Sequence, residues 1–192
     1  VIAGMYAVWH GPEGLTRIAR RVHRMAALVA AGAARIGHTV THADFFDTVR
    51  VDLSGSTAGK VMGAARKVGI NLRKAGSSSV VIALDETVGE VDVSDVLVAL
   101  NGGHPLAFTV ASLASDIDPR YDERFARTSA FLTHPVFTRY HAEHELLRYM
   151  RKLESRDRHA DDSRCEPRTD CRGRRLHNRR GHRAQYSVGN RR

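Results

Sequence analysis

Cysteine, aromatic side chains and long apolar runs are scarce in this sequence. Of 192 residues, only 2 are cysteines and 6% are aromatic. Both cysteines, Cys165 and Cys171, lie near the C-terminal end, which excludes a disulfide framework in the rest of the chain. The opening run VIAGMYAVW is too short to cross a bilayer, and no basic segment precedes it. We therefore expect no signal peptide and no membrane segment, and we predict a cytoplasmic protein.

Positive charge is distributed unevenly along the chain. Residues 1–154 carry 18 Lys and Arg against 16 Asp and Glu, whereas residues 155–192 carry 12 Arg, no Lys and 5 acidic residues. Most of the net charge of +9 therefore belongs to the last fifth of the chain. That segment has few apolar residues and no helical or strand period, so we predict a disordered, Arg-rich tail over residues 158–192.

Neither zinc binding nor nucleotide binding fits the motifs available. Cys165, Cys171, His177 and His182 are zinc-ligand types, but their spacing leaves no room for the strands and helix of a zinc finger. The segment GSTAGKVMG has too few residues between its glycines for a phosphate loop, and Val61 follows its lysine where Ser or Thr is needed. Arginines of the tail would bind nucleic acid only nonspecifically.

Apolar periodicity predicts a small mixed domain over residues 1–103. A turn at Gly11 and Pro12 starts a long helix that Gly37 ends, with an arginine row that we interpret as a solvated face. A strand over 45–53, a helix over 57–68 and a hairpin around Gly76 follow. A last helix, capped by Asp92 or Ser94, stops at glycines 102 and 103. Strands interleaved with helices indicate an α/β fold of α+β type, with one sheet covered on one face.

Beyond residue 103 the sequence predicts a connector and then a helix. Proline and aspartate residues interrupt residues 104–130, which we therefore predict to be irregular. Residues 131–137 are expected to be extended because Pro135 disfavours a helical His134. Residues 140–154 have an apolar stripe typical of a helix.

Two segments far apart in the sequence carry a resemblance. MYAVWHGPEGL begins at position 5, and TSAFLTHPVFTRYHAEHELLRYMRKLE begins at position 128. In that order they resemble the glycine cleavage system P-protein family, glycine dehydrogenase (decarboxylating). The resemblance implies that residues 1–103 are the small C-terminal domain of a fold-type-I pyridoxal phosphate enzyme half. It also implies that residues 104–157 are the linker and first helix of a second half.

The resemblance further implies an activity. Members of this family decarboxylate glycine on pyridoxal phosphate and pass the aminomethyl group to the lipoyl group of H-protein, as homodimers or paired subunits. The lysines Lys60, Lys67, Lys74 and Lys152 lack the family's Schiff-base context. We expect a truncated piece of the enzyme that does not bind the cofactor stably, has no catalytic residue and is inactive alone.

Thr133 and His134, in FLTHPVF, are the candidates for lining a substrate cleft. The other interpretation of His134 is a residue that hydrogen-bonds backbone in a linker. We interpret His10, His141 and His144 as structural, and we assign no metal site.

The tail leaves two further hypotheses open. Resemblance to the family stops near Asp157, and an Arg-rich sequence is typical of a shifted reading frame in a GC-rich gene, so residues 158–192 are interpreted as out-of-frame translation. Gene sequencing tests this idea. The alternative function is a stand-alone interaction module whose basic tail contacts nucleic acid.

Overall fold

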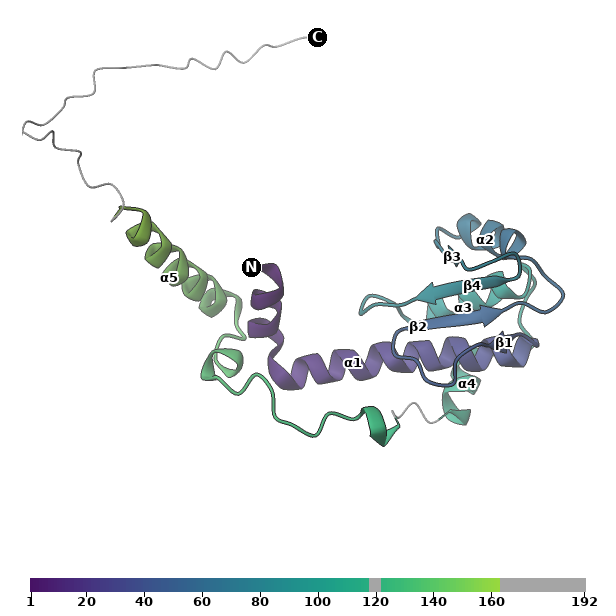
Figure 1. Ribbon diagram of the computed structural model, residues 1–192, viewed down its shortest axis with the longest axis horizontal. Coiled ribbons are helices and arrows are strands. Elements are labelled where there is room, and N and C mark those ends of the chain that lie inside the picture. The colour runs from purple at the N-terminus through teal and green to yellow at the C-terminus, as the bar shows by residue number, and fades with distance from the viewer. Residues whose placement is uncertain (118–121, 163–192) are drawn as a thin grey trace, which may run out of the picture. The chain divides into compact units, whose positions relative to one another are not determined.

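The computed structural model describes residues 1–117 and 122–162, and the side chains of residues 123 and 157–162 are left aside. Two compact units divide the chain, the first Val1–His141 and the second starting at Ala142 (Figure 1). The predictions for the tail beyond residue 162, including those on the four zinc-ligand types and on disorder, concern residues outside the described ones. No helix within residues 1–117 and 122–162 is both long and apolar enough to cross a membrane.

Helix α1, Ile2–Ile36, is the longest element of the first unit (Figure 1). The predicted helix after Gly11 is confirmed, and Gly37 ends it in the left-handed conformation (φ 101°), where its N–H reaches the carbonyls of the last turn. Residues ahead of Gly11 are also helical, which the sequence analysis did not predict. Gly11 itself is not helical, so α1 consists of two helical segments joined at a kink.

Four antiparallel strands form the sheet, in the order β1-β2-β4-β3. These are β1 (Thr39–Val40), β2 (Thr48–Asp52), β3 (Arg73–Lys74) and β4 (Ser79–Ala83). The hairpin prediction is confirmed by the β3–β4 pairing. The strand predicted over 45–53 is shorter in the structure, where β2 covers Thr48–Asp52. The edge strand β1 was not predicted, because two residues are too few to show an alternating pattern.

Helices α2 (Ala58–Lys67) and α3 (Glu90–Leu100) complete the domain. The α2 prediction is confirmed, with the Thr57 side chain accepting a hydrogen bond from the N–H of Lys60. The predicted cap of α3 by Asp92 or Ser94 is wrong: Gly89 is the N-cap. Asp92 lies within the first turn, and its carboxylate reaches back to accept the Gly89 N–H at 2.8 Å.

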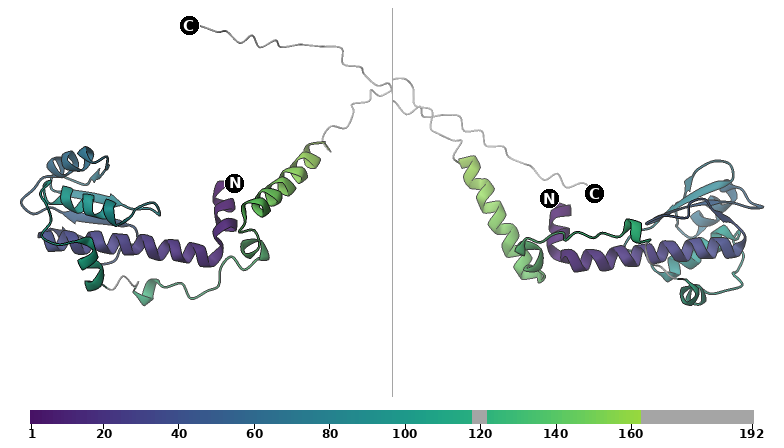
Figure 2. Two further views of the ribbon diagram at one scale, coloured as in Figure 1. Left: turned by 180° about the vertical axis from the view of Figure 1, so that it is seen from behind. Right: turned by 60° about the horizontal axis from the view of Figure 1, so that its bottom comes forward.

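The core lies between the sheet and the helices. The inward side chains of β2 and β4 pack with fully buried Leu28 of α1 and Leu97 of α3. In the view from behind, α3 lies directly against the sheet (Figure 2, left). Gly32 lets α1 and α3 approach closely, since a Cβ there would lie 2.5 Å from Leu97. The mixed α+β class with helices on a small sheet is therefore confirmed.

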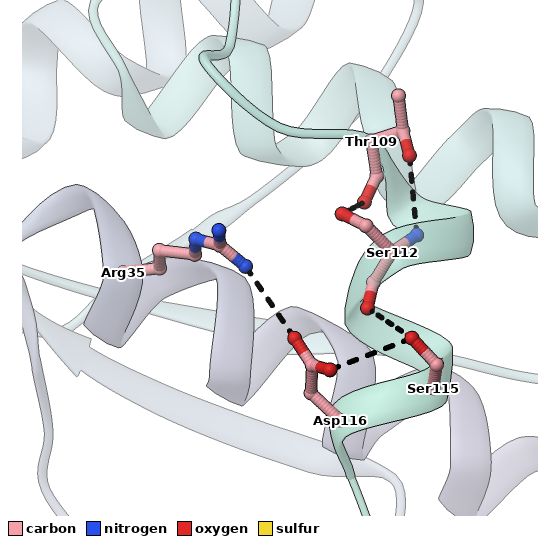
Figure 3. A network of polar contacts seen from close by, with 5 residues as sticks. All are labelled: Arg35, Thr109, Ser112, Ser115 and Asp116. Carbon is pink, nitrogen blue, oxygen red and sulfur yellow. Dashed lines mark hydrogen bonds and ion pairs between the residues drawn. The ribbon is translucent and has the colours of Figure 1, made fainter.

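The connector after α3 is more ordered than predicted. It contains α4, Val110–Asp116, and a 3-10 turn, Glu123–Phe125. The Thr109 side chain caps α4 by accepting the Ser112 N–H at 3.1 Å, and Arg35 of α1 pairs with Asp116 at 3.7 Å (Figure 3). The expectation of an irregular segment over 104–130 was wrong at α4, because a seven-residue helix is too short to show a clear period.

Two boundaries near the end of the described chain also differ. Pro135–Thr138 is a 3-10 helix, so the prediction of an extended segment over 131–137 is wrong there: Pro135 starts the turn, as proline commonly does. His134 is extended (φ −67°, ψ 138°), as predicted. In the second unit, α5 covers Glu143–Asp162, starting later and ending later than the predicted helix over 140–154.

Candidate functional site

The kink of α1 and the 3-10 helix Pro135–Thr138 lie in contact, which brings together the two sequence segments singled out above. A Cβ on Gly11 would lie 2.5 Å from the carbonyl oxygen of Phe137 and 3.3 Å from the His141 ring. The backbones therefore approach so closely that only glycine fits. This junction is the candidate functional site within the first unit.

The sequence Gly11-Pro12 produces the kink by two independent effects. Gly11 adopts φ 62° and ψ −178°, a region that is essentially restricted to glycine. Pro12 lacks an N–H, so one helical hydrogen bond cannot form across the junction. The Thr16 hydroxyl donates to the Pro12 carbonyl oxygen at 2.8 Å and secures the start of the second helical segment. Local chemistry thus breaks α1 at this position.

His141 clamps the junction from the other side. Its Nδ1 lies 2.7 Å from the carbonyl oxygen of Trp9. A carbonyl only accepts, so Nδ1 carries the hydrogen of this bond. The bond satisfies a carbonyl at the end of the first helical segment of α1, which agrees with the structural interpretation of His141.

A polar cavity of about 500 Å³ opens at the junction. Trp9, His10, Glu13 and Arg17 of α1 line it together with the turn that contains Phe137. These side chains supply aromatic surface and both signs of charge.

The Tyr6 and His10 rings lie in contact near the same end of α1, with centroids 4.3 Å apart and planes tilted by 56°. The Tyr6 hydroxyl donates to a carboxylate oxygen of Glu86 at 3.3 Å. Desolvation raises the pKa of Tyr6, and the negative charge of Glu86 raises it further. Tyr6 is therefore a protonated hydrogen-bond donor at neutral pH.

The two predicted cleft residues lie next to the junction. His134 is exposed, and its Nδ1 accepts the Val136 N–H at 3.2 Å, so the side chain caps the 3-10 helix. Thr133 is also exposed. It follows Leu132, whose φ of 51° is unusual for a branched residue and turns the chain before the motif. Neither residue lines the cavity.

Known proteins resemble this chain over most of its described length. A family model described as "Glycine cleavage system P-protein" matches residues 1–100. The chain belongs to the glycine cleavage system P-protein family. It is 44% identical over 156 residues to the mitochondrial glycine dehydrogenase (decarboxylating) of Pisum sativum, covering 81% of this chain and 15% of the pea protein.

Bacterial members of the P-protein family are similar to this chain over the same share of its length. Identity is 48% over 157 residues to the glycine dehydrogenase (decarboxylating) of Xanthomonas euvesicatoria pv. vesicatoria and 42% over 161 residues to that of a Nostoc species. Each comparison covers 82% of this chain and 16% of the relative. The chain thus spans about one sixth of the length of these relatives.

The lysines of this P-protein segment do not fit a pyridoxal phosphate site. A Schiff base requires a lysine held beside the cofactor in a protected pocket. All four lysines, Lys60, Lys67, Lys74 and Lys152, are exposed, and none lines the junction cavity.

Metal ligands do not cluster either: within residues 1–117 and 122–162 no group of three His, Cys, Asp or Glu side chains is placed to hold an ion. The turn at Gly11 and Pro12 was predictable from the sequence, whereas its contact with Phe137 and His141 was not. The only sign of this contact in the sequence was that both motifs of the family occur in the same chain. Contacts between residues so far apart in the sequence leave no periodic pattern.

Proposed function

We propose that this chain supplies the end of the first half and the start of the second half of a P-protein that decarboxylates glycine on pyridoxal phosphate. In this proposal the α+β domain is the small domain of a fold-type-I enzyme half. The family match over residues 1–100 and the junction of Gly11 with Phe137 together support it, since both sequence segments of the resemblance meet there.

The complete reaction, in the same proposal, requires polypeptide beyond this chain. The exposure of all four lysines supports the view that the Schiff-base lysine belongs to another part of the enzyme. H-protein then receives the aminomethyl group, and a second subunit or copy completes the assembly. Thr133 and His134 remain the proposed cleft residues, positioned by the turn at Leu132. A cytoplasmic location also remains a proposal.

Cofactor trapping tests the first part of this proposal. The chain is mixed with pyridoxal phosphate, the visible absorbance of the aldimine is recorded, and borohydride reduction is followed by mass spectrometry. We expect no stoichiometric adduct, since exposed lysines react only weakly and without site preference. A single lysine labelled at unit stoichiometry would show that the chain holds a cofactor site and would contradict the proposal.

Reconstitution tests the second part. A P-protein relative lacking the segment that matches this chain is mixed with the chain and lipoylated H-protein, and glycine decarboxylation is measured. We expect activity only when all three are present. The chain variant Gly63→Ala, changed at an exposed α2 position with open space around it, should be as active as the native chain. Lack of activity with a native chain that binds the truncated relative would contradict the assignment.

A further inference from the structure

A second, larger depression runs along α1 in the first unit. We call it the arginine-lined groove: one wall is α1 from Leu15 to Met25, and the facing walls are residues 44–46, 89–90 and 125–131. Its volume is about 1490 Å³, above the range of roughly 300–1,000 Å³ that small-molecule sites have. The α1 wall extends about 15 Å, at 1.5 Å per residue, or about three helical turns. A groove of this size fits a peptide segment better than a metabolite.

Apolar side chains form the floor of the arginine-lined groove. Leu15 and Ala19 of α1 are half-buried there, and Phe45 packs beside them. Phe46, which stacks on His23, is 44% exposed, and Phe125, which lies under the Arg124 guanidinium, is 60% exposed. Partly exposed apolar side chains gathered in one depression are typical of a site that another segment covers.

Unbalanced positive charge surrounds this floor. Arg20 and Arg24, four residues apart on α1, are exposed and have no carboxylate partner among the described residues. Arg21 donates to the carbonyl oxygens of Glu86 and Val88, at 3.2 and 3.1 Å, so its charge is held in place without being neutralised.

The acidic residues of the groove do not cancel this charge. Asp44 is paired with Arg124 at 3.4 Å. Glu90 lies in the first turn of α3, where the helix end already favours a negative charge. On the opposite wall Arg127 stacks on Phe131 and donates to a backbone carbonyl. The rim is therefore cationic on both sides.

We propose that the arginine-lined groove binds an acidic amphipathic helix from the part of the P-protein polypeptide that lies outside this chain. The apolar face of that helix covers Leu15, Phe46 and Phe125, and its carboxylates pair with Arg20 and Arg24. This is the helix-in-groove mode of recognition with charge complementarity at the rim. The occupant is assigned to the same polypeptide because relatives are about six times longer than the segment matched here. This last assignment rests on the proposed function.

Binding of the truncated P-protein relative to this chain tests the proposal. Its dissociation constant is measured by sedimentation velocity for the native chain, for Arg20→Glu/Arg24→Glu, and for Arg66→Glu/Arg73→Glu. The second double variant changes charge equally at exposed positions outside the groove. We expect the groove variant to bind about tenfold more weakly or worse, because like charges then face each other. The control should bind like the native chain, and circular dichroism verifies that both variants fold.

Competition identifies the chemistry of the occupant. A synthetic amphipathic helix with glutamates on its polar face should displace the relative from the native chain, and the same peptide with lysines should not. Equal binding by the native chain and the groove variant would overturn the groove proposal and leave the proposed function intact. Failure of the relative to bind even the native chain would count against both.

Discussion

Asp52 illustrates how single side chains shape the exposed face of the sheet. Its carboxylate accepts hydrogen bonds from the Ser79 hydroxyl at 2.6 Å and from the Thr41 hydroxyl at 3.0 Å. The Ser79 bond is the largest cause of a lowered Asp52 pKa, followed by Thr41, with a smaller contribution from Arg50 at 3.6 Å. A folded pKa below the unfolded one makes the ionised form stabilising.

The direction of this shift predicts a pH dependence. The stabilising contribution of Asp52 should be fully present above its ordinary pKa of about 3.9 and should be lost as pH falls through the lower folded pKa. Ser79→Ala removes the shorter bond, so the Asp52 pKa should rise towards its ordinary value. Carboxyl-carbon NMR titration measures it directly. Asp85, whose pKa is lowered mainly by the Thr87 hydroxyl, is the internal control and should not change. An unchanged Asp52 pKa in this variant would refute the assignment.

At the scale of elements, the kink of α1 is the feature that ties remote segments together. Gly11→Ala should destabilise the first unit by at least about 1–3 kcal/mol, the usual cost of a backbone held in such a region. The added methyl group would also meet the Phe137 carbonyl. Chemical denaturation measures the loss, and fluorescence of Trp9, the single tryptophan, reports the local change.

Gly63→Ala is the matched control for this element. Gly63 lies within α2, with nothing within 4 Å of the added methyl group. Gly63→Ala should therefore raise the free energy of unfolding by about 0.5–1 kcal/mol, because alanine loses less backbone entropy than glycine in a helix. Equal effects of the two substitutions would mean that the kink is not strained against Phe137.

Long elements with a clear apolar period were predictable from the sequence, whereas short elements and the α3 N-cap were not. Helix α2 and the second helical segment of α1 followed from the sequence pattern, and the end of α1 from Gly37. Gly89 was missed as a cap because it has no side chain, and the carboxylate of Asp92 supplies the bond instead. The segment at Pro135 was predicted to be extended because proline restricts the residue before it; that restriction holds at His134 but does not extend to residues 135–138, which form the 3-10 helix in contact with α1.

At the scale of the whole molecule, the two units should differ in stability. The first has a core that contains fully buried Val49, Val51 and Val80. In α5, by contrast, no residue with a described side chain is buried. Most of the stability of a helix in a protein comes from tertiary packing of its apolar face. Native-state hydrogen exchange should therefore show the slowest amides in β2 and β4 and exchange about 100-fold faster in α5. Equal protection would mean that both units unfold as one.

The sequence by itself determined the helices with clear periodicity, the α+β class and the family. These follow from local spacing and from motifs that can be compared residue by residue. Only the tertiary structure decided that Gly11 contacts Phe137 and that His141 hydrogen-bonds the Trp9 carbonyl oxygen. It also placed Arg20 and Arg24 at the edge of the arginine-lined groove. Such contacts join residues far apart in the chain, and the backbone geometry that allows them depends on the packing of the whole unit.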